Sequence, residues 1–66
     1  MTYAIEFYTE VAGMPTRLGC ALSGYRTIEA AVKAAVDYLR QTRYTNVSAA
    51  IIEEGLFSLR LREVKL

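Results

Sequence analysis

Apolar and polar residues alternate along the first ten positions of the chain. In residues 2–10, TYAIEFYTE, the side chains of Tyr3, Ile5 and Phe7 fall on one side of an extended backbone. Those of Glu6 and Tyr8 fall on the other side. Successive side chains of a strand point to opposite faces of its sheet, and aromatic and β-branched residues favour strands. The pattern therefore predicts a strand with one buried face.

The next segment, VAGMP, interrupts the alternation and predicts a turn. Gly13 accepts a positive φ, and Pro15 has no N–H to donate to a strand ladder. Residues 16–22, TRLGCAL, are then expected to return as a second, antiparallel strand. Gly19 lies inside that strand, where a glycine weakens regular pairing or marks a bulge.

A helical period follows in residues 27–43, TIEAAVKAAVDYLRQTR. Thr27 is the predicted N-cap, because a threonine hydroxyl accepts a hydrogen bond from the free N–H groups of the first turn. Apolar residues recur at spacings of three and four, which places them on one helix face. This stripe consists of Ile28, Ala31, Val32, Ala35, Val36 and Leu39. Its alanines allow the helix to lie close to a sheet.

Two more strands are predicted near the end of the chain, VSAAIIEE and LFSLRLREV, with a turn at Gly55 between them. In the last strand we expect Phe57, Leu59 and Leu61 to face the helix. Ile51 and Ile52 are adjacent, so one of them must lie on the sheet face away from the helix. That far face is expected to collect the following residues: Ala4, Glu6, Tyr8, Leu56, Arg60, Arg62, Val64 and Leu66.

The element order is β-β-α-β-β, which predicts an α+β fold with one antiparallel sheet and a single helix packed on one face. The chain has 66 residues, and we expect them to form a single domain. A chain of this size buries only about 60% of its unfolded surface, so its core is small. The lone Cys20 excludes an intramolecular disulfide. Self-association is a common way for such a small domain to gain stability.

One segment resembles a known family. Residues 18–39, LGCALSGYRTIEAAVKAAVDYL, are similar to the stretch of HicB-type antitoxins in which a hairpin ends in a Gly-Cys pair and a Thr-x-Glu helix start follows. The helix is shorter here, and no proline precedes the Gly-Cys pair. The resemblance implies a similar hairpin and helix, and we carry over no functional residue from it.

The composition argues against an enzyme and against a metal or cofactor site. The chain has no histidine, the side chain that most often serves as a general base. A single thiol does not make a zinc site, and we expect Cys20 to be a buried, unreactive side chain. Glu53 and Glu54 are adjacent at a predicted turn, which indicates solvated carboxylates. The glycines match no phosphate or dinucleotide loop.

The charge balance leaves two binding functions open. The net charge is only +1, although six of the eight cationic residues are arginine. Arginine with tyrosine is typical of protein interfaces, and arginine also binds phosphates. A nucleic-acid-binding module would use Arg40, Arg43, Arg60 and Arg62. Against this alternative, Glu6 is expected to form a cross-strand ion pair with Arg60 or Arg62.

Our leading hypothesis is a small non-enzymatic protein that binds another protein as a regulator, inhibitor or accessory subunit, of the kind that phages and mobile elements encode. The expected contact residues are Tyr8, Ile52, Arg60 and Arg62, on the far sheet face. We also expect it to form a homodimer. No signal peptide or membrane-length apolar run is visible, which favours a cytoplasmic protein without a membrane partner.

Overall fold

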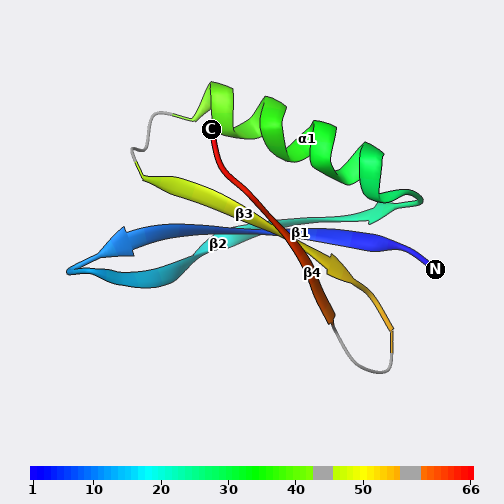
Figure 1. The fold of residues 1–66 in the computed structure, drawn as a ribbon, viewed down its shortest axis with the longest axis horizontal. Helices are drawn as coiled ribbons and strands as arrows, with labels where there is room; N and C mark the ends of the chain where they lie inside the picture. Colours follow the sequence, from blue (N-terminus) through cyan, green and yellow to red (C-terminus); the bar gives the residue numbers. More distant parts are fainter. Residues whose placement is uncertain (43–45, 56–58) are drawn as a thin grey trace.

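The computed structural model describes residues 1–42, 46–55 and 59–66, with Cys20 described by its backbone alone. Within these residues the elements are β1 (Tyr3–Val11), β2 (Met14–Tyr25), α1 (Ile28–Gln41), β3 (Val47–Glu53) and β4 (Leu59–Val64). Figure 1 shows one twisted sheet with the helix lying across it. The predicted α+β fold and its β-β-α-β-β order are confirmed.

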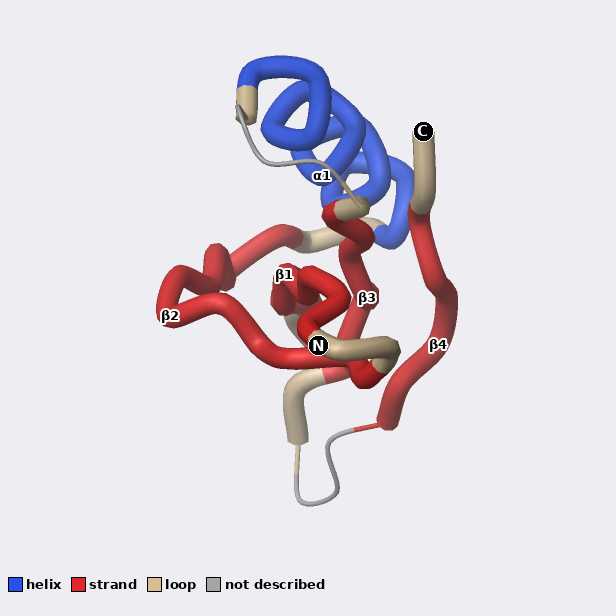
Figure 2. Tube along the Cα trace, turned by 90° about the vertical axis from the view of Figure 1, so that its left-hand side faces the viewer, coloured by secondary structure: helices blue, strands red, loops and turns tan. Residues whose placement is uncertain are grey.

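The sheet is antiparallel, with the strand order β2-β1-β3-β4. β1 and β3 form its centre, and β2 and β4 form its edges. Helix α1 connects the edge strand β2 to the central strand β3 and covers one face of the sheet (Figure 2). The opposite face lies away from the helix.

The helix begins where its cap was predicted. The Thr27 hydroxyl accepts a hydrogen bond of 3.0 Å from the Ala30 N–H, which satisfies one free donor of the first turn. The helix ends at Gln41, two residues before the predicted end, and the Thr42 N–H donates to the Tyr38 carbonyl at 3.0 Å. Among the described residues, no helix is both long enough and apolar enough to span a membrane.

The core lies between α1 and the centre of the sheet. Ile5, Phe7 and Ile51 are its largest fully buried side chains, and Tyr3 packs at its margin. The predicted inward face of the first strand is therefore confirmed. Two alanines of the helix stripe, at positions 31 and 35, are also fully buried and allow close contact with the sheet. The rings of Phe7 and Tyr38 lie with their centroids 4.1 Å apart.

The first hairpin has a two-residue turn. Val11 pairs with Met14, and the residues between them, Ala12 and Gly13, both have positive φ, at 52° and 80°. Positive φ at both positions suits the right-handed twist of a hairpin. The predicted turn is confirmed, although Pro15 lies inside β2. A proline is tolerated there because β2 is an edge strand.

Strand β2 is longer than the predicted 16–22 and is irregular near Gly19. Its pairing with β1 shifts register between Glu6, which pairs with Ala21, and Tyr8, which pairs with Arg17. Three residues of β2 therefore lie opposite one residue of β1. The glycine does mark a bulge.

Strand β4 departs from the predicted alternation. Arg62 pairs with Ile51 and Arg60 pairs with Ile52, so Leu61 is an extra residue in the strand. Because of this extra residue, the alternation of faces before Leu61 is out of step with the alternation after it. Leu59 pairs with Glu53, the cross-strand partner of Tyr3, so it lies on the helix side of the sheet as predicted, but it is 54% exposed and outside the core. The prediction is wrong for Leu61, which is the extra residue and is 41% exposed. Val64, which was expected on the far face, is buried in the core instead. Phe57 and Leu56 lie outside the described residues.

Candidate protein-binding face

The sheet face away from α1, here called the open face, is defined by the pairing of its strands. Glu6 of β1, Ala50 of β3 and Glu63 of β4 form one row across the sheet. Residues paired directly across antiparallel strands point to the same side. A second row consists of Ala4, Ile52 and Arg60, and Tyr8 lies next to Ser48 and Arg17. Within the described part of the chain, no helix or strand covers this face (Figure 2).

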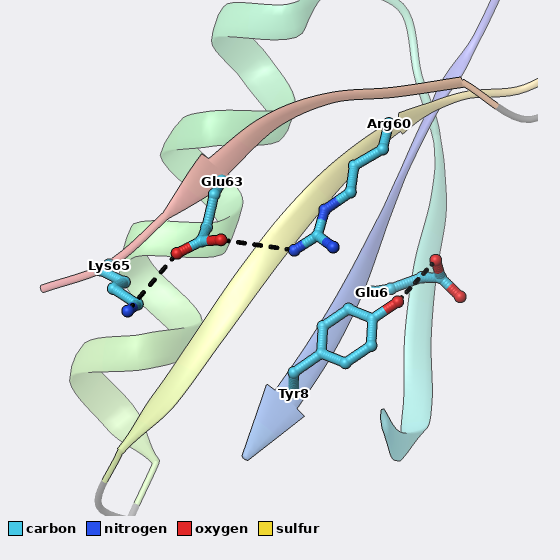
Figure 3. Close-up of polar contacts among 5 residues, drawn as sticks. All are labelled: Glu6, Tyr8, Arg60, Glu63 and Lys65. Atoms are coloured by element: carbon cyan, nitrogen blue, oxygen red, sulfur yellow. Dashed lines mark hydrogen bonds and ion pairs between the residues drawn. The ribbon is translucent and has the colours of Figure 1, made fainter. Parts of the chain in front are cut away.

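An arginine and a tyrosine stack on the open face. The guanidinium carbon of Arg60 lies 5.3 Å from the centroid of the Tyr8 ring, within the range of a cation–π contact. Figure 3 shows the Arg60 side chain reaching from β4 toward the tyrosine of β1. The Tyr8 hydroxyl donates to a carboxylate oxygen of Glu6 at 3.2 Å. The ring and the hydroxyl of Tyr8 are therefore both held by a neighbouring side chain.

Ion pairs lie on both sides of the Tyr8–Arg60 stack. On the β2 side, Arg17 donates to Glu6 at 2.8 Å. On the β4 side, Glu63 forms ion pairs with Arg60 and with Lys65, each at 3.5 Å (Figure 3). These side chains are largely exposed except Glu6, and each exposed pair contributes at most about 1 kcal/mol to stability. They order the surface more than they stabilise the fold.

Ala50 shows that the side chains of the open face pack together. Its pairing with Glu6 and Glu63 places its side chain on this face, yet its accessible surface is zero. It does not belong to the core cluster on the helix side. The longer side chains of the neighbouring strands therefore shield it. The result is a polar surface with a tyrosine and a half-buried isoleucine, Ile52, at its centre.

Three of the four predicted contact residues lie on the open face, and one does not. Tyr8 and Arg60 are in contact, and Ile52 is the cross-strand partner of Arg60. Arg62 pairs with Ile51, whose side chain is in the core, so it projects from the helix side. The prediction that Arg60 and Arg62 share a face is wrong because Leu61 adds a residue between them.

The arginines predicted to bind nucleic acid do not lie together on one face among the described residues. Arg40 lies in the last turn of α1, on the other side of the sheet from Arg60. Arg43 lies outside the described residues. The predicted ion pair between Glu6 and the last strand is replaced, since Glu6 pairs with Arg17 of β2. Nucleic-acid binding through these four arginines stays a prediction.

A groove that the sequence did not predict borders the open face. Its volume is about 560 Å³, and it runs from Tyr8, Arg60 and Glu63 around the end of the sheet to Leu39 and Leu66. Glu63 and Lys65 were also missed as members of the surface. The charge on each is visible in the sequence, but its place beside Tyr8 depends on the bulge in β4.

No group of three His, Cys, Asp or Glu side chains among the described residues is placed to hold a metal ion. Glu54, predicted to be solvated, is half-buried and accepts hydrogen bonds from the Thr2 hydroxyl at 3.1 Å and the Gly24 N–H at 3.4 Å. These contacts tie the start of β1 and the end of β2 to the end of β3. The side chain of Cys20 lies outside the described residues.

No protein-family model, curated protein or solved structure matches this chain. These comparisons do not support the resemblance of residues 18–39 to HicB-type antitoxins, which stays a prediction from the sequence. The function proposed below rests on the geometry of the open face.

Proposed function

We propose that this chain is a small, non-enzymatic binding protein that regulates, inhibits or assists another protein by contacting it through the open face and the adjoining strand β4. The observation that carries the proposal is the Tyr8–Arg60 stack on an uncovered sheet face. Tyrosine and arginine are the side chains most often responsible for affinity at protein interfaces. Ile52, half-buried beside them, adds an apolar contact.

The preorganisation of this pair supports the proposal. The Tyr8 hydroxyl is already bound to Glu6, and the Arg60 guanidinium is already bound to Glu63. Side chains that are fixed before binding lose less conformational entropy when a partner arrives. The open face also has nearly equal numbers of positive and negative groups, which favours a partner with a mixed surface over a uniformly acidic one.

The test is affinity capture from the source cell, followed by affinity measurement with the purified partner. We expect Tyr8→Ala and Arg60→Ala each to weaken binding by about thirtyfold or more, the loss that marks a hot spot. Arg26→Ala and Arg40→Ala are matched controls, because these arginines are exposed and lie before and within α1, away from the open face and from β4. Equal binding by all four variants would remove the open face from the interface.

The alternative, a nucleic-acid-binding module, has a separate test. Binding through phosphate contacts weakens steeply as salt rises, so it should be strongest at about 50 mM salt. Titration of the chain with labelled DNA and RNA at that salt gives the answer. Binding that falls with salt and is weakened by Arg40→Ala would favour the alternative over the proposed function.

A further inference from the structure

The open face carries two different kinds of ion pair. Arg17 and Glu6 are 2.8 Å apart, the usual length of a charge-assisted hydrogen bond, and the Glu6 side chain is only 22% exposed. Arg60 and Lys65 each lie 3.5 Å from Glu63, and all three side chains are at least half exposed. We call Arg60, Glu63 and Lys65 the Glu63 cluster. Long, exposed contacts are weak, so this cluster can admit a further charged group without the loss of a strong bond.

The Glu63 cluster contains two positive charges and one negative charge. One oxygen of Glu63 faces Arg60 and the other faces Lys65, so both carboxylate oxygens have a cationic partner (Figure 3). Arginine and lysine have several N–H donors each. Neither Arg60 nor Lys65 has a second hydrogen bond or ion pair with a described residue. Donors are therefore left over, and a second carboxylate would give each cation an acceptor of its own.

The Glu63 cluster lines the groove of about 560 Å³ that borders the open face, a volume large enough for side chains of another molecule. Tyr8 and Ser48 line the same groove. Ser48 is the β3 partner of Tyr8 and is half-buried, and its hydroxyl has no hydrogen bond with a described residue. A carboxylate that enters the groove therefore meets a free hydroxyl as well as two cations.

A second carboxylate, that of Glu10, also lines the groove. Glu10 lies in β1, two strands away from β4 and two residues beyond Tyr8. Strand spacing and residue rise put its backbone roughly 12 Å from that of Lys65. Exposed charges at that distance are largely screened at physiological salt, where the Debye length is about 8 Å. The charge that an incoming group meets beside β4 is therefore set by the Glu63 cluster.

We propose that the Glu63 cluster binds one acidic side chain, an aspartate or a glutamate, of the partner protein. The incoming carboxylate pairs with Lys65 and with the remaining N–H groups of Arg60, while Glu63 keeps its contact with Arg60. This inference rests on the proposed function and specifies one chemical group that the partner places in the groove. The balanced charge of the rest of the open face favours such a partner over a nucleic acid, whose binding usually needs a net basic surface.

The test uses a phage-displayed library of random short peptides as the probe. Peptides selected on the wild-type chain should be enriched in aspartate and glutamate, and selection on Lys65→Glu should remove that enrichment. Fluorescence polarisation with one selected acidic peptide then compares neutral variants. Lys65→Gln should weaken binding about threefold, the effect of one exposed ion pair. Glu63→Gln should bind at least as tightly as the wild type, because it removes the negative charge of the cluster. Lys33→Gln, at an exposed lysine of α1, is the control and should change nothing.

Three results would overturn the proposal: a wild-type selection without acidic enrichment, equal binding by Lys65→Gln and the wild type, or a loss in Glu63→Gln as large as that in Lys65→Gln. Circular dichroism checks that each variant is folded. A labelled oligonucleotide that displaces the peptide and depends on Lys65 would assign the cluster to phosphate and also refute the proposal. Peptides that need Tyr8 but show no acidic preference would leave the proposed function intact and refute this inference alone.

Discussion

Ile51 and Ile52 are consecutive in β3 and project from opposite faces of the sheet. Ile51 is fully buried against α1, whereas Ile52 is half-buried on the open face beside Arg60. Two neighbouring isoleucines therefore have different surroundings and different roles. Ile51 fills the core, and Ile52 lies on the open face.

Matched substitutions should separate these two roles. Ile51→Val removes a methyl group from the core and should lower the free energy of unfolding by about 1 kcal/mol, because a small cavity remains. Ile52→Val should change it by less than about 0.5 kcal/mol, since the site is partly solvated. Urea denaturation followed by circular dichroism measures both. Equal losses would mean that the two positions are equally buried in solution.

The split between these isoleucines could be predicted from the sequence, because adjacent residues of any regular strand point apart. The helix and its Thr27 cap could be predicted for a similar reason. Their signals are local, consisting of a period of three and four and a threonine before it. The alternation of Tyr3, Ile5 and Phe7 is local as well, and the structure keeps it.

The faces of β4 could not be predicted in this way. Leu59, Leu61, Arg60 and Arg62 alternate as regularly in sequence as the residues of β1. The bulge arises from how β4 pairs with β3, and no residue type in the strand predicts it. The Tyr8–Arg60 stack depends on that pairing too. A sequence shows which residues can meet, but the register decides which do.

The first turn offers a test of backbone strain. Ala12 and Gly13 both have positive φ, a conformation that asparagine and glycine adopt more easily than alanine. Ala12→Asn should therefore stabilise the protein by a few tenths to about 1 kcal/mol, and Gly13→Ala should destabilise it by roughly 1 kcal/mol. Thermal denaturation monitors both changes.

Gly19→Ala is the matched control for this turn. Its φ is outside the positive range, and an added Cβ would meet no atom within 4 Å. We expect its stability to stay within about 0.5 kcal/mol of the wild type. A loss at Gly19 as large as that at Gly13 would argue against strain as the cause.

The helix cap should be measurable in isolation. Thr27→Ala removes the acceptor of the 3.0 Å bond from the Ala30 N–H and should cost about 1 kcal/mol. Thr27→Ser keeps the hydroxyl and should retain most of that stability. Urea denaturation compares the two variants. If Thr27→Ser loses as much as Thr27→Ala, packing of the threonine methyl, rather than the cap, explains the effect.

Glu54 should hold the beginning of β1 against the ends of β2 and β3. Its carboxylate accepts hydrogen bonds from Thr2 and Gly24, and its own N–H donates to the Thr2 carbonyl at 3.0 Å. Glu54→Ala removes the side-chain bonds and leaves the backbone bond, so we expect a loss of about 1 kcal/mol. Amide hydrogen exchange should become faster at Gly24 and in the first residues of β1, because a terminal strand with fewer contacts opens more often.

Glu53→Ala is the control for this change, because Glu53 is the neighbouring glutamate and pairs with Tyr3 and Leu59 through its backbone. Its substitution should leave hydrogen exchange at Gly24 unchanged. If Glu54→Ala leaves that exchange unchanged as well, the carboxylate does not tie the strands together. Faster exchange at Gly24 in Glu54→Ala alone would assign the effect to the hydrogen bonds of the Glu54 side chain.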